Sequence, residues 1–224
     1  HCSGEEFDAL FGSEDYGWKM AEVMGIRYIP VNRVRDLVPI SGTAMRNDPM
    51  RNWDYLPVVV RPYFAKRVAI VGPGATGKSA LAKNLAGYYH NYFVAEYKRS
   101  FLDEYKTHQK TSQAEDQYEH VATIARGQIA TEDSLVKRAN RVIIADTDIS
   151  SIVFWSKRQF KQCPDWVVRE AEKRSYGLYF LSESDNAGDH ADNEDRKNTA
   201  AEWEELLKKK QATYIKINGT NNER

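Results

Sequence analysis

The run Gly72-Pro-Gly-Ala-Thr-Gly-Lys-Ser79 constrains this chain more than any other feature. It matches the Walker A pattern in full, with an apolar segment, 68–71, before it and a helix expected from Lys78 after it. Glycines at these positions let the backbone curl, so that successive N–H groups point at one phosphate. The sequence therefore predicts a P-loop. The alternative is a glycine-rich turn with a surface lysine.

The residue types in this run also indicate a role for each position. Lys78 would act as a catalytic cation on the β and γ phosphates of ATP, and Ser79 would offer its hydroxyl to Mg²⁺. The N-terminus of the following helix adds favourable partial charge. We expect the nucleotide to be bound by Gly72, Gly74, Ala75, Thr76, Gly77, Lys78, Ser79 and Ala80. ATP and Mg²⁺ are the cofactors that this arrangement predicts.

From Arg67 onward, short apolar segments alternate with longer segments that can form helices. This alternation is typical of a mostly parallel sheet covered by helices, because right-handed helical crossovers fit between the strands. We expect strands at 68–71, 92–94, 141–145, 178–181 and 214–217. The prediction is an α/β fold with a parallel five-stranded sheet.

Two segments between these strands have a recognisable character. A long helix is expected over 115–139, and its apolar side chains on one face indicate core packing. Those side chains are Val121, Ile124, Ala125 and Ile129. Residues 182–198 are polar and acidic, which suits either a mobile flap over a site or a plain solvated loop.

The first part of the chain, 1–66, has a different pattern. Apolar segments at 7–11 and 26–31 predict two strands, the first of them buried, with a helix over 15–24 between them. Prolines punctuate residues 33–66, so only short helices and turns are expected there. This region is too short for a complete α/β domain, and we divide the chain into domains 1–66 and 67–224.

The charge balance argues against several classes of partner. The chain has 32 lysine and arginine residues together and 32 aspartate and glutamate residues together. There is therefore no overall positive charge that would point to nucleic acid or to an acidic membrane surface as a partner. No segment approaches the apolar length of a membrane span. Cys2 and Cys163 have no metal-ligand spacing and no secretory segment precedes them, which favours the cytoplasm and argues against a disulfide framework. A small-molecule substrate is the expected partner.

Acidic residues follow two of the expected strands. Asp146 stands at the carboxyl end of 141–145, where a P-loop protein needs a carboxylate for Mg²⁺, and Asp148 could serve a substrate hydroxyl. The alternative for this pair is a turn or a helix cap. Glu96 follows the second strand and is a candidate base or ribose ligand. Arg99 could meet a phosphate, although a surface charge cluster is an equal alternative.

With these motifs in place, the chain resembles the bifunctional bacterial NadR family. Members of that family join a nicotinamide-nucleotide adenylyltransferase to a ribosylnicotinamide kinase. Ile40-Ser-Gly-Thr-Ala-Met-Arg46 is similar to the Ile-Ser-x-Thr-x-x-Arg signature of nucleotidylyltransferases. The resemblance implies a partial Rossmann-like adenylyltransferase domain in 1–66, with ATP phosphates held by Ser41, Thr43 and Arg46.

The kinase half of the family is matched by two further runs. The run Glu96-Tyr97-Lys98-Arg99 is similar to the family's Trp-Glu-Tyr-Gly-Arg motif. The run Asp146-Thr147-Asp148 is similar to the family's Asp-Thr-Asp motif. The resemblance implies that ATP phosphorylates ribosylnicotinamide in NAD biosynthesis. The catalytic residues would be Lys78, Glu96, Asp146 and Asp148, and the substrate would be bound by Glu96, Tyr97, Arg99 and Asp148.

The chain also departs from the family pattern. Ala95 stands where the family has a tryptophan, and Lys98 replaces a glycine. The His-x-Gly-His motif of adenylyltransferases is absent, so we expect this chain to begin inside that domain and to lack adenylyl transfer by itself. A homo-oligomer or a complementing chain is therefore also a candidate partner. The alternative functions are a nucleotide-sensing regulatory module and a kinase of another nucleoside. No Asn-Lys-x-Asp motif of GTPases occurs.

Overall fold

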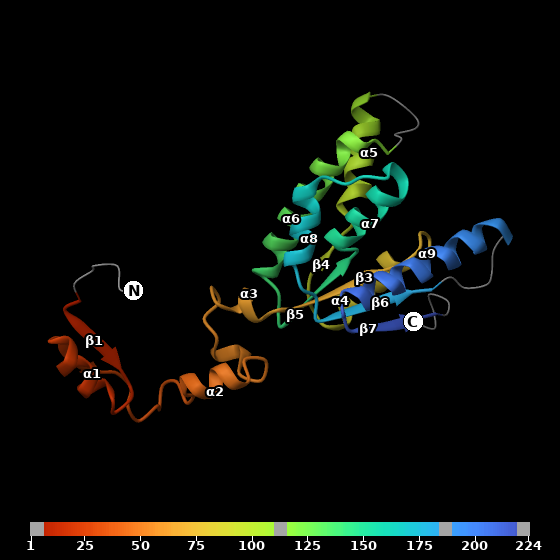
Figure 1. Cartoon of the computed structure of the whole chain (residues 1–224). Coiled ribbons are helices and arrows are strands. Elements are labelled where there is room, and N and C mark those ends of the chain that lie inside the picture. The colour runs from red at the N-terminus through yellow and green to blue at the C-terminus, as the bar shows by residue number, and fades with distance from the viewer. Residues whose placement is uncertain (1–6, 110–115, 184–189, 219–224) are drawn as a thin grey trace. The chain divides into compact units, whose positions relative to one another are not determined.

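The computed structural model describes residues 7–109, 116–183 and 190–218 (Figure 1). The chain divides into two compact units, His1–Pro57 and Val58–Arg224. Each unit is described by itself below. The functional boundary at residue 66 stays a prediction.

The first unit contains a parallel strand–helix–strand element. Strands β1 (Ala9–Gly12) and β2 (Arg27–Pro30) pair in parallel, and helix α1 (Gly17–Met24) connects them. The Tyr28 hydroxyl donates to the carbonyl oxygen of Gly12 at 2.8 Å, which ties the end of β1 to β2. A Cβ at Gly17 would lie 2.2 Å from the Tyr28 ring, so glycine is needed where α1 begins.

The prediction of a buried first strand is wrong. Phe11 on β1 is 65% exposed, because this sheet has two strands and one helix to cover it. The rest of the unit consists of the short helix α2 (Gly42–Asn47) and the 3-10 helix η1 (Trp53–Tyr55), as the prolines predicted.

The second unit is an α/β domain around a parallel five-stranded sheet, which confirms the predicted fold class. The sheet order is β4-β5-β3-β6-β7. Its strands are β3 (Lys66–Val71), β4 (Phe93–Val94), β5 (Val142–Asp146), β6 (Leu178–Ser182) and β7 (Tyr214–Ile217). The strand that leads into the P-loop is therefore central, with β5 and β6 as its direct neighbours.

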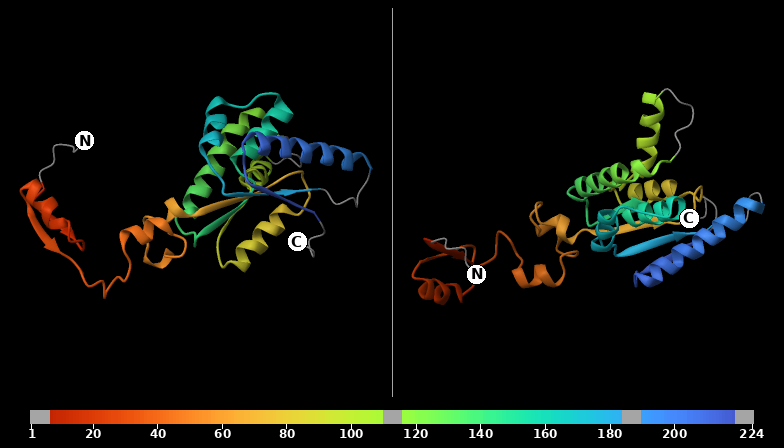
Figure 2. Two further views of the ribbon diagram at one scale, coloured as in Figure 1. Left: turned by 60° about the horizontal axis from the view of Figure 1, so that its bottom comes forward. Right: turned by 45° about the horizontal axis from the view of Figure 1, so that its top comes forward.

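Helices cover both faces of this sheet. The helices of this unit are α3 (Arg61–Phe64), α4 (Lys78–Tyr88), α5 (Tyr97–Gln109), α6 (Tyr118–Val136), α7 (Ile149–Phe160), α8 (Asp165–Lys173) and α9 (His190–Lys209), of which α4, α6 and α9 contact the strands. Ala82 and Ala86 of α4 pack against Ile70 and Ile144 on one face. Both views in Figure 2 place α4, in yellow, and α9, in blue, on opposite sides of the sheet.

The helix predicted over 115–139 is present as α6, with Val121, Ile124 and Ala125 buried as expected. The alternative of a plain loop over 182–198 is wrong over 190–198, because these residues form the first half of α9, and a flap over the site stays a prediction. Residues 184–189 lie outside the described part of the chain. Trp203 and Leu207 in the second half of α9 are both 1% exposed. Their burial anchors a helix whose first half is polar.

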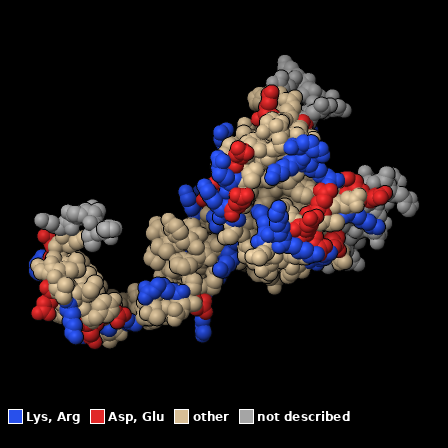
Figure 3. Space-filling view, viewed as in Figure 1, with Lys and Arg blue, Asp and Glu red and all other residues tan. Residues whose placement is uncertain are grey.

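Charges are mixed over the second unit. On the face seen in Figure 3, basic and acidic side chains alternate. Arg158 of α7, for example, lies between Asp195 and Glu202 of α9, at 2.5 Å from each. Among the described helices, none is both long and apolar enough to cross a membrane.

Candidate functional site

The P-loop connects β3 to α4 through a backbone that requires glycine. Gly72 has φ 130°, and a Cβ there would lie 2.4 Å from the carbonyl oxygen of Ser182 on β6. Gly77 has φ 77° and is the N-cap of α4. Glycine adopts these two conformations with less strain than other residues. The N-terminus of α4 therefore opens on the loop, as a phosphate site needs.

Side chains hold the loop in this shape. The Thr76 hydroxyl donates to the carbonyl oxygen of Pro73 at 3.0 Å, and the Ser182 hydroxyl donates to that of Thr76 at 3.3 Å. Lys78 reaches back across the loop, and its Nζ donates to the same Pro73 carbonyl. The lysine is thus held over the cradle, where an incoming phosphate would compete for its charge.

Asp146 stands beside the P-loop because β5 pairs directly with β3. It is 3% exposed, and its Oδ1 has no hydrogen-bond partner among the described residues. Asp146 and Ser79 line one cavity of about 320 Å³ together with Glu96. Hydroxyl and carboxylate oxygens are the donors that Mg²⁺ prefers, so the two fit this ion.

The protein offers few ligands for such a metal. No cluster of three or more histidine, cysteine, aspartate or glutamate side chains suited to a metal occurs in the described residues. Magnesium here would therefore need phosphate oxygens and water to complete its coordination, which is its usual mode of binding in phosphate sites.

Asp148 is placed differently from Asp146. It is fully buried and caps α7, with Oδ1 accepting from the N–H and the hydroxyl of Ser151 at 2.9 Å each. Its Oδ2 accepts from the Tyr179 hydroxyl at 3.1 Å. Burial and the nearby Asp148 raise the pKa of Tyr179, so its hydroxyl stays a donor. From the sequence, a helix cap was an alternative for this residue, and the structure shows that cap. A substrate role for Asp148 stays a prediction.

Thr147 makes the turn between these two carboxylates. Its φ of 67° is unusual for a β-branched residue and costs roughly 1–3 kcal/mol. Its N–H donates to the carbonyl oxygen of Ile70 at 3.1 Å, which ties the turn to β3. This bond keeps Asp146 on the P-loop side while Asp148 turns into α7.

The residues around Glu96 form the opposite rim of the site. The Glu96 carboxylate is 29% exposed and lies 3.4 Å from Arg99. Lys98 is paired with Asp116 at 2.5 Å. The Tyr97 ring packs on α6 instead, where a Cβ at Gly127 would lie 2.1 Å from it. The structure thus brings Glu96 and Arg99 to the cleft, and the substrate role of Tyr97 stays a prediction.

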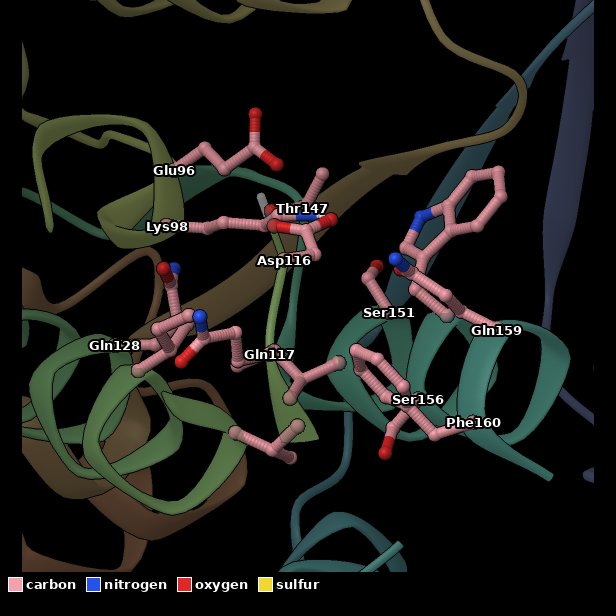
Figure 4. A pocket seen from close by; sticks show the side chains of 14 residues that line it. Glu96, Lys98, Asp116, Gln117, Gln128, Thr147, Ser151, Ser156, Gln159 and Phe160 are labelled. Carbon is pink, nitrogen blue, oxygen red and sulfur yellow. Dashed lines mark hydrogen bonds and ion pairs between the residues drawn. The ribbon is translucent and has the colours of Figure 1, made fainter. Parts of the chain in front are cut away.

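Two hollows meet at this rim. The larger is a cleft of about 650 Å³ whose lining includes Gly74–Ala80 and Arg99. The other, called here the inner pocket, lies between the start of α5, α6 and α7, with apolar walls from Val121, Ile124, Ile152 and Phe160 (Figure 4). Both are lined by Glu96, Lys98, Asp116, Thr147, Trp155 and Gln159. A phosphate donor in the cleft would face an acceptor in the inner pocket at Glu96.

Residues 67–224 match the family described as AAA domain. The chain belongs to this family. Its match covers the P-loop and all of the sheet except Lys66, the first residue of β3.

Two curated relatives of this AAA domain chain carry the same name, trifunctional NAD biosynthesis/regulator protein NadR. The Escherichia coli K12 protein is 31% identical over 183 residues, covering 81% of this chain and 44% of the relative. The Salmonella typhimurium LT2 protein is 32% identical over 164 residues, covering 73% and 39%. The chain therefore spans less than half the length of these relatives.

Solved structures share the fold. A NadR protein in complex with NR has a TM-score of 0.72 at 20% identity, over 96% of this chain and 64% of that one. A NadR protein in complex with NAD and AMP-PNP has a TM-score of 0.72 at 19% identity, over 95% and 61%. These structures confirm the fold, and the two sequence relatives confirm the resemblance to the NadR family.

Several residues that line the inner pocket were missed from the sequence. Trp155 and Gln159 lie one and two turns beyond Ile152 on α7, so the helical spacing from Asp148 could have revealed them. Gln128 lies on the apolar stripe of α6, where a polar side chain was a signal. Ala95, already noted in the sequence as a departure from the family pattern, lines the cavity beside Asp146.

The residues expected to bind ATP in the first unit lie on α2. Ser41 is the N-cap, accepting from the Ala44 N–H at 3.0 Å, and Arg46 lies 3.5 Å from the Thr43 hydroxyl. The structure brings these three residues together on one short helix. Their role in binding phosphates stays a prediction.

Proposed function

We propose that this chain transfers the γ-phosphoryl group of ATP to the 5′-hydroxyl of ribosylnicotinamide, giving nicotinamide mononucleotide. The observation that carries the proposal is the shared rim of the two hollows, where Glu96 faces both the P-loop cleft and the inner pocket. The names of the relatives support it, because they refer to NAD biosynthesis and to complexes with NR, NAD and AMP-PNP.

On the donor side, Lys78 and the N-terminus of α4 stabilise the charge of the phosphates. Ser79 and Asp146 would hold Mg²⁺. When bound, the ion would neutralise part of the negative charge of the phosphates. The unpartnered Oδ1 of Asp146 supports this role, because a buried carboxylate oxygen without a donor is costly unless a ligand supplies one.

On the acceptor side, Glu96 orients the ribose hydroxyl and accepts its proton. Its carboxylate is partly exposed and has a weak contact with Arg99, whereas the oxygens of Asp148 are engaged by Ser151 and Tyr179. The 5′ oxygen forms a bond to the γ-phosphorus as the bond to the bridging oxygen breaks. The electron pair of that bond leaves with ADP. Positioning and charge stabilisation supply most of the rate.

The test is a panel of nucleosides incubated with the chain and MgATP, with ADP release and the phosphorylated product both measured. We expect steady ADP production that depends on ribosylnicotinamide and yields nicotinamide mononucleotide. Nucleotide binding by calorimetry without turnover of any nucleoside would contradict the proposal and favour a nucleotide sensor. Turnover of a different nucleoside alone would retain the kinase and reject this acceptor.

A further inference from the structure

The amide of Gln128 has a defined orientation in the wall of the inner pocket. This residue of α6 is 2% exposed, and its Oε1 accepts a hydrogen bond from the backbone N–H of Tyr97 at 2.8 Å. Because a backbone N–H can only donate, the atom that faces it must be the amide oxygen. The Nε2 group is therefore fixed as the remaining donor of this side chain.

That donor has no partner among the residues that the structure describes. Nε2 of Gln128 is buried and makes no hydrogen bond to any described residue. Folded proteins pair nearly all of their buried polar groups, because water is lost without compensation when one is left alone. A buried donor in a pocket wall therefore points to an acceptor supplied by a ligand.

The surroundings of Gln128 suit a flat ring. Val121 and Ile124 precede it on α6, and Ile152 and Trp155 face the pocket from α7. Figure 4 shows Gln128 on the α6 side, opposite Ser151 and Gln159 of α7. Apolar side chains would cover the faces of a base, and a polar group would be left to recognise its edge.

We propose that Nε2 of Gln128 donates a hydrogen bond to a carbonyl oxygen on the base of the acceptor nucleoside. This inference rests on the proposed function and narrows its substrates to nucleosides whose base carries such an oxygen. The same side chain supports Tyr97, the residue after Glu96, through the bond to its N–H. Recognition of the base is thereby coupled to the position of the carboxylate that receives the ribose hydroxyl.

The experiment compares two matched pairs of nucleosides in the ADP-release assay. Ribosylnicotinamide is paired with ribosylpyridinium, which lacks the carboxamide, and inosine with purine riboside, which lacks the carbonyl. In the pair that the wild-type chain phosphorylates faster, kcat/KM should be about 10- to 100-fold higher for the nucleoside whose base carries the carbonyl oxygen. Equal use of both members of each pair overturns the inference and leaves the kinase standing, whereas turnover of no nucleoside overturns both.

The substitution Gln128→Glu tests the same contact from the protein side. A carboxylate can still accept from the Tyr97 N–H, whereas an acceptor oxygen and a formal negative charge replace the donor toward the pocket. The preference for the carbonyl-bearing nucleoside should fall to about twofold or less. Gln211→Glu, which makes the same change on an exposed residue after α9, should keep the wild-type preference. An unchanged preference in Gln128→Glu would mean that solvent satisfies the amide, and the inference would be rejected. The wild-type comparison decides the matter even if this variant does not fold.

Discussion

Ile70 of β3 and Asp146 of β5 are direct partners in the parallel sheet. Since Ile70 lies two residues before Gly72, this register brings the carboxylate to the edge where the P-loop begins. The Thr147 N–H extends the same alignment by donating to the Ile70 carbonyl. One pairing of strands thus assembles the phosphate cradle and the proposed metal carboxylate.

We expect Lys78→Ala to lower kcat/KM for phosphoryl transfer by about 100- to 1,000-fold, because one preorganised charge on the transferring group is worth that much. ADP release measures the loss, and circular dichroism checks the fold. The control is Lys173→Ala on α8, which removes an exposed cation away from the cleft. Near wild-type turnover in a folded Lys78→Ala variant would show that the P-loop does not bind the transferring phosphate.

Asp146→Asn should separate activity from stability. We expect about a 100-fold or greater loss of turnover and a higher requirement for Mg²⁺, because a ligand of the ion is weakened. Thermal unfolding without nucleotide should give the same or a higher Tm, since a buried carboxylate with one oxygen lacking a described partner loses its formal charge. Asp103→Asn, on the exposed side of α5, is the control. A Tm that falls by several degrees would mean that Asp146 has a structural role.

Two glycines in helices should respond to alanine with opposite signs. At Gly127, a Cβ would lie 2.1 Å from the Tyr97 ring, so Gly127→Ala should lower the free energy of unfolding by about 1–3 kcal/mol. It should also lower turnover, because Tyr97 is next to Glu96. Nothing lies within 4 Å of a Cβ at Gly87 of α4, so Gly87→Ala should raise stability by about 0.5–1 kcal/mol. Urea unfolding measures both, and equal effects at the two positions would contradict the packing of Tyr97 on α6.

Glu204 on α9 should make stability depend on pH in the acid range. Hydrogen bonds from Lys208, Lys216 and Tyr214 lower the pKa of this carboxyl from its usual 4.5 to about 2. A folded pKa below the unfolded one gives stability that is present above pH 4.5 and is lost as the pH falls toward 2.

The measurement is the difference in Tm between the wild type and Glu204→Gln. The Tm of the wild type should be higher than that of the variant at pH 7, and the difference should become smaller as the pH falls below 4.5. It should also become smaller in high salt, because the ion pairs of Glu204 with Lys208 and Lys216 lie near the surface. Glu205→Gln changes the charge equally at the neighbouring position and is the control. A Tm difference that stays constant from pH 7 to pH 3 would show that the cluster does not hold Glu204 ionised.

The local features of the site were readable from the sequence. Gly72 and Gly77 impose backbone conformations that few other residues adopt, and Lys78 and Ser79 follow at fixed spacing, so the P-loop could be predicted. Asp146 was predictable because a carboxylate at the end of a buried strand lies at the same edge of a parallel sheet. These features depend on residues close together in the chain.

The tertiary structure decided which polar groups are engaged and which are open to a ligand. Asp146 and Asp148 are equivalent in the sequence, but packing by Ser151 and Tyr179 makes one a helix cap, while the other keeps an oxygen without a described partner. Gln128 meets the Tyr97 N–H from 31 positions away, and Lys98 meets Asp116 from 18. Such partners come from the way α5, α6 and α7 pack, and side-chain hydrogen bonding depends on those distances of a few ångströms. Spacing along the chain determines backbone geometry, whereas only packing determines which donors and acceptors remain for a substrate.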